Sequence, residues 1–221
     1  MDEKKRQRLQ DIYQRLLSFF GPQHWWPAAE PFEVVVGAIL TQSTAWSNVE
    51  KSIANLKKAG VLTPQALRAI PRDELAGLIY SCGYYNVKAE KLKAFAQWFG
   101  ERFDDSLEKM FAGDTWSLRE ELLKVYGVGE ETADSILLYA GNKPVFVVDA
   151  YTRRIIDRLG LQPGGRRYAD YQKLFMQNLP NDVLLFNEYH ALMVALGKNH
   201  CLKNQPDCDH CCLNEGCAFK H

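Results

Sequence analysis

Four cysteines near the end of the chain have the spacing of a metal-binding loop. Cys201, Cys208, Cys211 and Cys217 are separated by six, two and five residues, and a loop of that size can bring four thiolates to tetrahedral corners. Either a [4Fe-4S] cluster or a Zn²⁺ ion is compatible with this set. Zinc ribbons usually carry two separated Cys-x-x-Cys pairs, whereas this segment has one, so the spacing alone leaves both open. Cys212 adjoins a ligand, and a register that uses it is a minor alternative.

A second chemical pattern is the tripeptide Gly127-Val128-Gly129. Two glycines around one small apolar residue let the backbone turn sharply and expose its N–H groups. Such groups at the start of a helix favour an anion and bind phosphate without reading sequence. Downstream, the apolar run 145–148 delivers one acid, Asp149. Its carboxylate has a structural interpretation as the N-cap of the next helix, which is compatible with a second, chemical role.

Aromatic residues are concentrated in two short stretches, Trp25-Trp26-Pro27 and the segment that ends at Trp46. Aromatic faces stack on any base, at roughly 1–3 kcal/mol each, and they attract cationic rings. A positively charged N-alkylated purine is already a good leaving group, so an aromatic slot beside a carboxylate would suit it. The alternative is that these tryptophans belong to the core.

The elements that must position these residues are helices. Apolar residues recur at helical spacing, with glycine, proline and cap residues between the repeats. The single strand-like stretch, 145–148, has no partner. The pattern predicts an all-α protein of roughly ten helices, over 9–20, 32–40, 49–59, 64–70, 73–82, 87–99, the two short hairpin helices, 151–159, 168–178 and 182–199.

Composition limits the function. The 221 residues are 47% hydrophobic and 24% charged, with a net charge of zero, which is ordinary for a globular protein. Neutrality argues against a strongly basic nucleic-acid binder, so DNA affinity would have to come from local groups. The first residues lack a signal-peptide core and no apolar run approaches about 18 residues. We therefore expect a cytoplasmic protein that does not bind membranes.

Together these features resemble endonuclease III and the helix-hairpin-helix DNA glycosylase superfamily. The resemblance runs from about Pro31 to Cys217 and includes the 6-2-5 cysteine spacing, which matches the iron–sulfur loop of endonuclease III. Its other motifs are Leu40-Thr41-Gln42, Gly83-Tyr84-Tyr85-Asn86-Val87-Lys88-Ala89, the hairpin followed by Thr132-Ala133, and Val147-Val148-Asp149.

This resemblance implies a two-lobed fold and a cofactor. A six-helix barrel with the hairpin would span 23–143, and residues 1–22 plus 144–221 would form a second helical domain. That domain would carry the [4Fe-4S] cluster loop at 201–217, with the cluster in a structural role.

The resemblance also implies chemistry. Loss of a base builds positive charge on the sugar, and a fixed carboxylate beside that carbon stabilises it; the resemblance gives Asp149 this catalytic role. Bifunctional members attack the sugar with a lysine two residues after the second hairpin glycine. Glu131 occupies that position here and cannot form a Schiff base. The sequence therefore predicts a monofunctional enzyme with weak or absent AP-lyase activity.

The pattern is most similar to the 3-methyladenine glycosylase branch, in which aromatics form a sandwich around the flipped base. The matching positions are Trp25, Trp26, Pro27, Trp46 and Glu131. The best-known enzymes of that branch lack the iron–sulfur loop, which this chain keeps.

The predicted DNA-binding residues fall into two groups. By resemblance, Gln42 fills the gap left by the flipped nucleotide and Tyr84 wedges the opposite strand. The remaining members are the hairpin backbone and three cations expected at phosphates, namely Gly127, Val128, Gly129, Lys88, Arg153 and Lys198.

We therefore predict a base-excision-repair glycosylase that acts as a monomer on damaged double-stranded DNA and releases alkylated purines. One alternative is a glycosylase for uracil, mismatched thymine or another damaged base. An alternative of another class is a non-catalytic iron–sulfur protein that binds DNA structure.

Overall fold

The computed structural model describes residues 3–26 and 30–219, and these residues include no β-strand. The all-α fold expected from the sequence is therefore confirmed. The chain divides into two compact units, one of Ala28–Lys143 and one that combines Met1–Pro27 with Pro144–His221. We call them the central unit and the terminal unit. The described helices include none that is long and apolar enough to cross a membrane.

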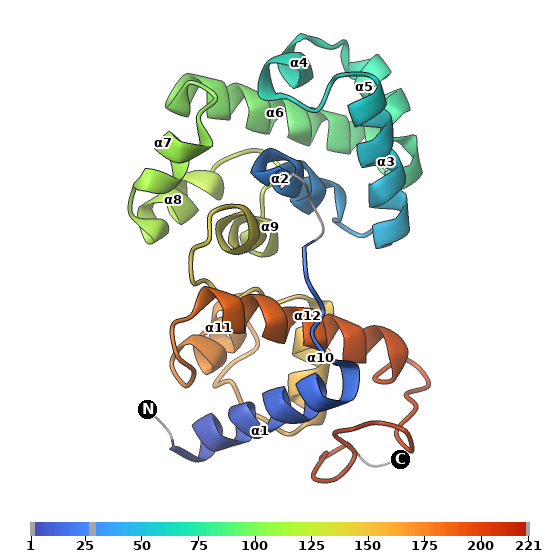
Figure 1. The fold of residues 1–221 in the computed structure, drawn as a ribbon, viewed down its shortest axis with the longest axis vertical. Coiled ribbons are helices and arrows are strands. Elements are labelled where there is room, and N and C mark those ends of the chain that lie inside the picture. Colours follow the sequence, from blue (N-terminus) through green and yellow to red (C-terminus); the bar gives the residue numbers. More distant parts are fainter. Residues whose placement is uncertain (1–2, 27–29, 220–221) are drawn as a thin grey trace. The chain divides into compact units, whose positions relative to one another are not determined.

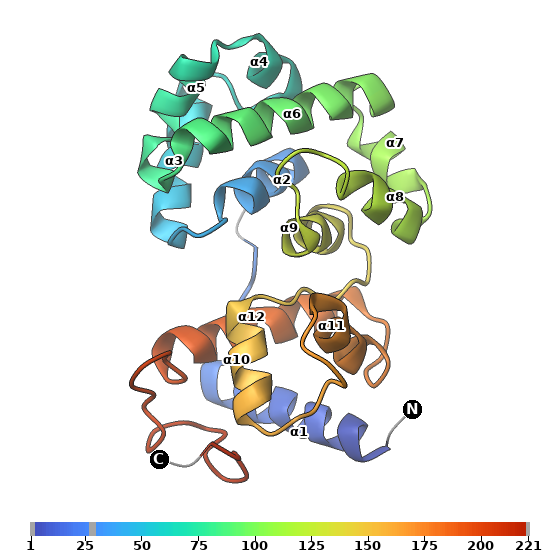
Figure 2. The ribbon, with the colours of Figure 1, turned by 180° about the vertical axis from the view of Figure 1, so that it is seen from behind.

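The central unit is built around one buried helix. In α2 (Pro31–Leu40) every residue from Phe32 to Leu40 is buried, as a helix that is apolar all round requires. It packs against α3, α6 and the π-helical turn η2, and α6 lies along α4 and α5 (Figures 1 and 2). The other elements are α3 (Trp46–Lys58), α4 (Pro64–Ala69), α5 (Arg72–Leu78), η1 (Tyr80–Cys82), α6 (Tyr85–Phe103), α7 (Leu107–Ala112), α8 (Thr115–Leu122), α9 (Glu130–Ser135) and η2 (Ile136–Ala140).

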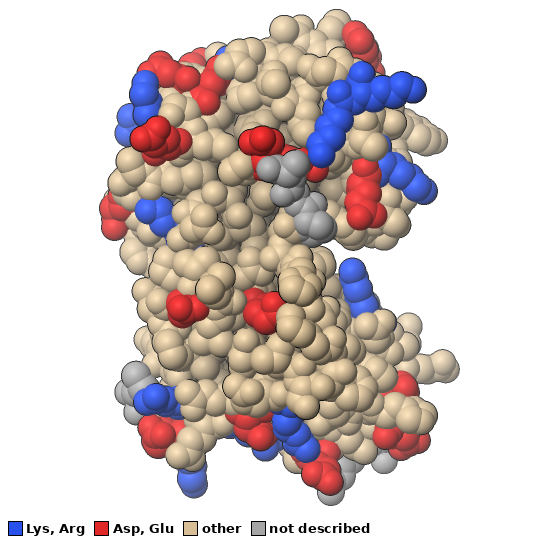
Figure 3. Space-filling view, in the orientation of Figure 1, with Lys and Arg blue, Asp and Glu red and all other residues tan. Residues whose placement is uncertain are grey.

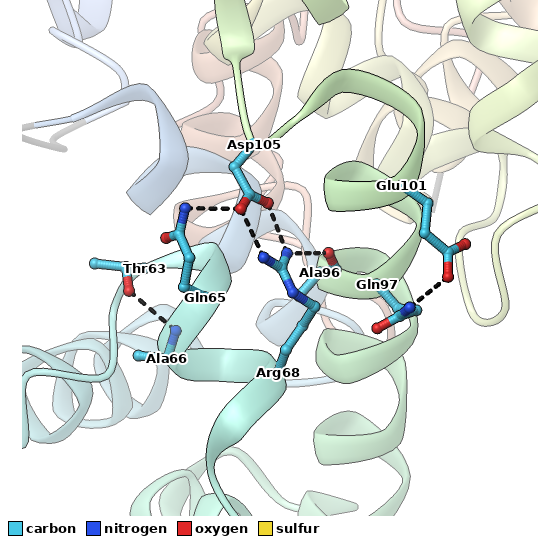
Figure 4. A network of polar contacts seen from close by, with 8 residues as sticks. All are labelled: Thr63, Gln65, Ala66, Arg68, Ala96, Gln97, Glu101 and Asp105. Atoms are coloured by element: carbon cyan, nitrogen blue, oxygen red, sulfur yellow. Dashed lines mark hydrogen bonds and ion pairs between the residues drawn. The ribbon is translucent and has the colours of Figure 1, made fainter.

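A charged network joins α4 to the end of α6 (Figure 4). The Arg68 guanidinium donates to both carboxylate oxygens of Asp105 at 2.6 Å and to the Ala96 carbonyl at 2.7 Å. Gln65 donates to the same carboxylate at 2.7 Å. These hydrogen bonds, that of Arg68 first, lower the pKa of Asp105. The two-pronged geometry fixes direction as well as distance.

The terminal unit brings the two ends of the chain together. It contains α1 (Glu3–Phe20), α10 (Ala150–Arg158), α11 (Tyr168–Met176) and α12 (Val183–Asn199). Helix α12 packs against α1 and α10, and the Tyr189 hydroxyl donates to the Leu9 carbonyl at 2.9 Å. The 145–148 run is extended and buried but forms no strand. Within it, Phe146 stacks on Phe175 with ring centroids 3.8 Å apart.

Three details differ from the sequence-based expectations. Residues 23–26, expected in the barrel, belong to the terminal unit, where the Gln23 N–H donates to Glu188 Oε1 at 2.7 Å. The predicted helix 73–82 ends at Leu78 and continues as the 3₁₀ turn η1. Helix α7 was not predicted, and α8, the first of the two expected hairpin helices, lies earlier than expected and ends at Leu122. Both helices begin after a residue whose side chain forms an N-cap hydrogen bond, Ser106 for α7 and Asp114 for α8.

Candidate active site and DNA-binding residues

The hairpin joins α8 to α9 within the central unit. Gly127 has φ of +82°, a conformation that side chains other than glycine rarely adopt. The Val128 side chain is buried and its N–H donates to the Val125 carbonyl at 3.0 Å. Gly129 is the extended residue before α9. The tripeptide thus forms the sharp turn that the sequence predicted.

A buried ion pair holds the two hairpin helices together. The Arg119 guanidinium of α8 donates to Asp134 of α9 through two bonds of 2.6 and 3.0 Å. The Asp134 side chain is 0% exposed and that of Arg119 is 15% exposed. Such a bidentate pair fixes the mutual orientation of two short helices. Neither residue was predicted from the sequence.

A polar network lies against the hairpin turn. Gln42 Nε2 donates to the Gly127 carbonyl and to Thr132 Oγ1, each at 2.9 Å. The Lys91 ammonium of α6 donates to Gln42 Oε1. These residues line an open cavity of about 590 Å³ together with Lys124 and the hairpin turn. Lys91 was not predicted, because the spacing of residues along α6 does not indicate which side chain contacts the hairpin.

Asp149 lies in the terminal unit at the N-terminus of α10. It is buried, and its Oδ1 accepts a 2.7 Å hydrogen bond from the Thr152 N–H. The cap that the sequence suggested is therefore present. The backbone before it is also fixed, because the Val148 N–H donates to the Tyr168 hydroxyl at 3.1 Å. The second carboxylate oxygen remains available for another role.

That second oxygen faces a histidine. Asp149 Oδ2 lies 3.8 Å from Nε2 of His190, which is buried on α12. Burial lowers the pKa of His190, and the nearby Asp149 charge opposes that shift. A lowered pKa favours the uncharged imidazole at neutral pH. His190 was not predicted from the sequence, in which it lies 41 positions from Asp149.

Lys88 requires a correction. It was expected to contact a DNA phosphate, but its side chain is 2% exposed. Its ammonium donates to the carbonyls of Leu40 and Cys82 at 2.9 and 2.8 Å, and burial lowers its pKa. Lys88 therefore ties the end of α2 to η1 and does not present its charge to a ligand.

The other predicted DNA contacts have varied surroundings. Tyr84 is 75% exposed and precedes α6 with φ of +47°, an accessible position for a wedge. Arg153 lies 5.8 and 5.7 Å from the ring centroids of Tyr168 and Tyr171. Lys198 is exposed, with its ammonium 5.9 Å from the Trp25 ring centroid.

The proposed stacking tryptophans belong to both units. Trp25 and Trp26 lie in the terminal unit with their rings edge to face, at 74° and 5.9 Å between centroids. A base cannot lie parallel to both rings at once. Trp46 begins α3 of the central unit and donates to Glu50 Oε1 at 2.9 Å. Pro27 lies outside the described residues.

Glu131, at the lyase-lysine position, is exposed in the first turn of α9. Two carboxylates there suit the positive end of a helix. The neighbouring Glu130 lies 3.7 Å from Arg119, and the Glu131 carbonyl accepts a 2.7 Å bond from Ser135 Oγ. The place of Glu131 in the first turn of α9 thus gives its carboxylate a structural role at the helix dipole.

The four predicted cysteine ligands line a single cavity after α12. The same cavity is bordered by Arg158, whose guanidinium donates to Cys201 Sγ at 3.2 Å and to two carbonyls of the loop. Cys217 Sγ donates to the Arg158 carbonyl at 3.3 Å. In the described part of the chain, no three potential ligands are arranged around the position of one metal ion.

Charge is mixed over the visible surface. Acidic and basic side chains are interspersed on the face shown in Figure 3, as expected from 27 basic and 27 acidic residues. On that face, charge does not mark the DNA-binding surface.

Comparison with known proteins decides the family. Residues 36–181 match the model of the HhH-GPD superfamily of base excision DNA repair proteins. The chain belongs to the HhH-GPD superfamily. It is a base-excision-repair DNA glycosylase, and its partner is DNA.

HhH-GPD relatives align over almost the whole chain. A Methanocaldococcus jannaschii protein, provisionally named a DNA repair glycosylase, is 44% identical over 100% of both chains. Endonuclease III of Thermotoga maritima is 30% identical, covering 96% of this chain and 92% of its own.

Solved structures show the same HhH-GPD fold. A DNA-bound endonuclease III, trapped as a covalent intermediate, has a TM-score of 0.83 at 25% identity and covers 96% of this chain and 95% of its own. The Helicobacter pylori 3-methyladenine DNA glycosylase MagIII, bound to 1,N6-ethenoadenine, has a TM-score of 0.77 at 30% identity, covering 90% and 99%.

Proposed function

We propose that this glycosylase removes alkylated purines such as 3-methyladenine by hydrolysis, with Asp149 as the catalytic carboxylate. The observation that carries the proposal is that the two carboxylate oxygens of Asp149 have different surroundings. Oδ1 is held by the Thr152 N–H, while Oδ2 faces the buried His190. A carboxylate fixed by its own helix start is preorganised to stabilise positive charge that develops on the sugar.

The reaction we propose is monofunctional. At the position where a Schiff-base lysine would stand, Glu131 offers a carboxylate that cannot attack the sugar as an amine. The nearest lysines along the chain, Lys124 and Lys143, are outside that position. Water then completes hydrolysis with Asp149 orienting or deprotonating it.

The choice of base rests on aromatic chemistry and on one relative. Trp25, Trp26 and Trp46 supply faces that attract a cationic purine. Their role in holding the base is still a prediction. The likeness to MagIII, a 3-methyladenine DNA glycosylase at 30% identity, supports alkylated purines over neutral pyrimidines.

We also propose that the cysteine loop holds a [4Fe-4S] cluster. All four thiols line one cavity, as a group that binds four thiolates requires. Their 6-2-5 spacing resembles the iron–sulfur loop of endonuclease III, to which this chain is similar, and this favours the cluster over zinc. Its anchoring by Arg158, and by Arg8 and Arg15 of α1 at Gly216 and Glu215, suits a structural role for the cluster.

The decisive experiment is a panel of duplexes that each carry one defined lesion. We expect release of 3-methyladenine or 7-methylguanine, with strand breaks only after alkali. Breaks without alkali would refute the monofunctional assignment. Preferential release of uracil or mismatched thymine would replace the proposed substrate, and DNA binding without release of any base would favour a non-catalytic protein. Iron and sulfide analysis should find about four of each per chain, and zinc in their place would reject the cluster.

Two further expectations belong to this proposal. The enzyme acts as a monomer, which light scattering of the purified protein would test. It works in the cytoplasm, at the nucleoid if the cell is bacterial or archaeal, which imaging of a labelled copy would test.

A further inference from the structure

A lysine from another helix lies against the hairpin turn. The Lys91 side chain comes from α6 and lies against Gly127, where an added Cβ would stand 2.2 Å from Lys91 Cγ. The glycine therefore has a second reason to lack a side chain, besides its φ of +82°. Because Gly127 has no side chain, the aliphatic part of Lys91 can cross the turn. The stem ends in an ammonium at the edge of the open cavity.

The charge of Lys91 is not neutralised inside the protein. Within the described residues Lys91 forms no ion pair, and its ammonium donates to the neutral amide oxygen of Gln42. This differs from Arg68 and Arg119, whose charges meet the carboxylates of Asp105 and Asp134. Lys124, exposed on the rim of the same cavity, adds a second positive charge. Two cations in one open cavity beside an exposed turn attract an anion.

Gln42 fixes where the Lys91 ammonium lies. Both N–H groups of its amide are used, one on the Gly127 carbonyl and one on Thr132 Oγ1. These two hydrogen bonds fix the orientation of the Gln42 amide, so that Oε1 faces Lys91. The arrangement differs from the role expected from the sequence, in which Gln42 extends into the gap left by a flipped nucleotide. In this structure its polar atoms are engaged within the hairpin.

We propose that Lys91, aided by Lys124, binds a DNA backbone phosphodiester in the hairpin cavity, and that Gln42 is the positioning residue for Lys91. The proposal rests on the proposed DNA contact of the hairpin and adds two side-chain cations to it. Phosphate is the ligand that the geometry favours, because both cations line one open cavity beside a turn of the kind that binds phosphate without reading sequence.

The test measures binding of the full chain to an undamaged duplex at several salt concentrations. Lys91→Met keeps the stem on Gly127 and removes the charge. One phosphate contact fewer should reduce the slope of log K against log salt by about 0.9, which weakens binding about eightfold at 0.1 M salt if affinities converge at 1 M. Lys91→Arg should keep the slope. The control is Lys58→Met, an exposed lysine of α3 outside the cavity, which should bind like wild type.

Gln42→Ala separates positioning from gap filling. If Gln42 positions Lys91, its removal weakens binding to undamaged duplex, and adding it to Lys91→Met costs little more. If it fills the gap, the loss appears only with lesion-bearing DNA and is independent of Lys91. That result would overturn the positioning role.

An unchanged salt slope for Lys91→Met would overturn the phosphate contact. Gly127→Ala then separates the two proposals, provided that its circular dichroism matches wild type. If Gly127→Ala no longer binds the duplex, the hairpin still contacts DNA but Lys91 does not. If it binds like wild type, both the hairpin contact and the Lys91 contact are refuted.

Discussion

Substitutions at Asp149 can separate its two roles, because each carboxylate oxygen has its own partner. Oδ1 caps α10 through the Thr152 N–H at 2.7 Å, and Oδ2 faces His190 at 3.8 Å. Asp149→Asn keeps an oxygen for the cap and removes the charge. Asp149→Ala removes both. Asp149→Ser restores a cap acceptor without charge.

The expected magnitudes differ between the two roles. A charge pair at about 4 Å with an effective dielectric near 20 is worth roughly 4 kcal/mol, so losing the carboxylate should slow base release about a thousandfold. Loss of the cap should cost about 1 kcal/mol of unfolding free energy, or about 2–4 °C in Tm for a chain of this length. All three variants should therefore be slow, but only Asp149→Ala should lose stability through the cap.

The assay is single-turnover release of a labelled alkylpurine at saturating enzyme, paired with thermal unfolding of each variant. Equal slowing by Asn and Ser with near-native Tm would support the assignment. If Asp149→Asn released base at the wild-type rate, the carboxylate would be a cap alone and the proposed mechanism would be wrong. If Ala and Asn unfolded at the same temperature, the cap argument would fail instead.

Three further predictions concern stability. Arg119→Met removes the bidentate partner of the buried Asp134 carboxylate, so we expect a loss of about 3 kcal/mol. Arg102→Met, at a more exposed pair, should unfold close to wild type, and equal effects would show that burial is not decisive. Lys88→Met should destabilise by about 1–2 kcal/mol, because the Leu40 carbonyl loses its donor while the Cys82 carbonyl keeps only Thr44. The salt slope of DNA binding should stay unchanged, and a lower slope would restore Lys88 as a phosphate contact. Burial lowers the pKa of His190 in the folded protein. As the pH falls below about 6.5, the pKa of histidine in the unfolded chain, the unfolded chain therefore binds the proton first. The free energy of unfolding then drops by up to about 1.4 kcal/mol per pH unit. His190→Gln should flatten that pH dependence in urea unfolding, and an identical slope in both proteins would refute this account.

Features fixed by nearby residues were predictable from the sequence. The hairpin turn follows from glycines and the α10 cap from an acid before a helix, and both needed only local rules. The burial of Lys88 could not be predicted by such local rules. A lysine on a helix reaches either solvent or buried carbonyls, depending on which elements pack against its face of the helix. The spacing of residues along one helix does not specify those elements. The pairing of Lys91 with Gln42 is equally non-local, since it joins residues 49 positions apart.

A chain with no net charge can bind DNA only through local fields. Among the described cations of the central unit, Arg68 and Arg119 are paired with carboxylates, and Lys88 donates to carbonyls. Lys91 differs from the two arginines because its partner is a neutral amide, and from the buried Lys88 because it lines an open cavity, so its field extends into that cavity. In such a protein the distribution of partners, more than the number of basic residues, determines where a phosphate binds. Few phosphate contacts also mean a shallow salt dependence, which leaves recognition of the damaged base to short-range chemistry.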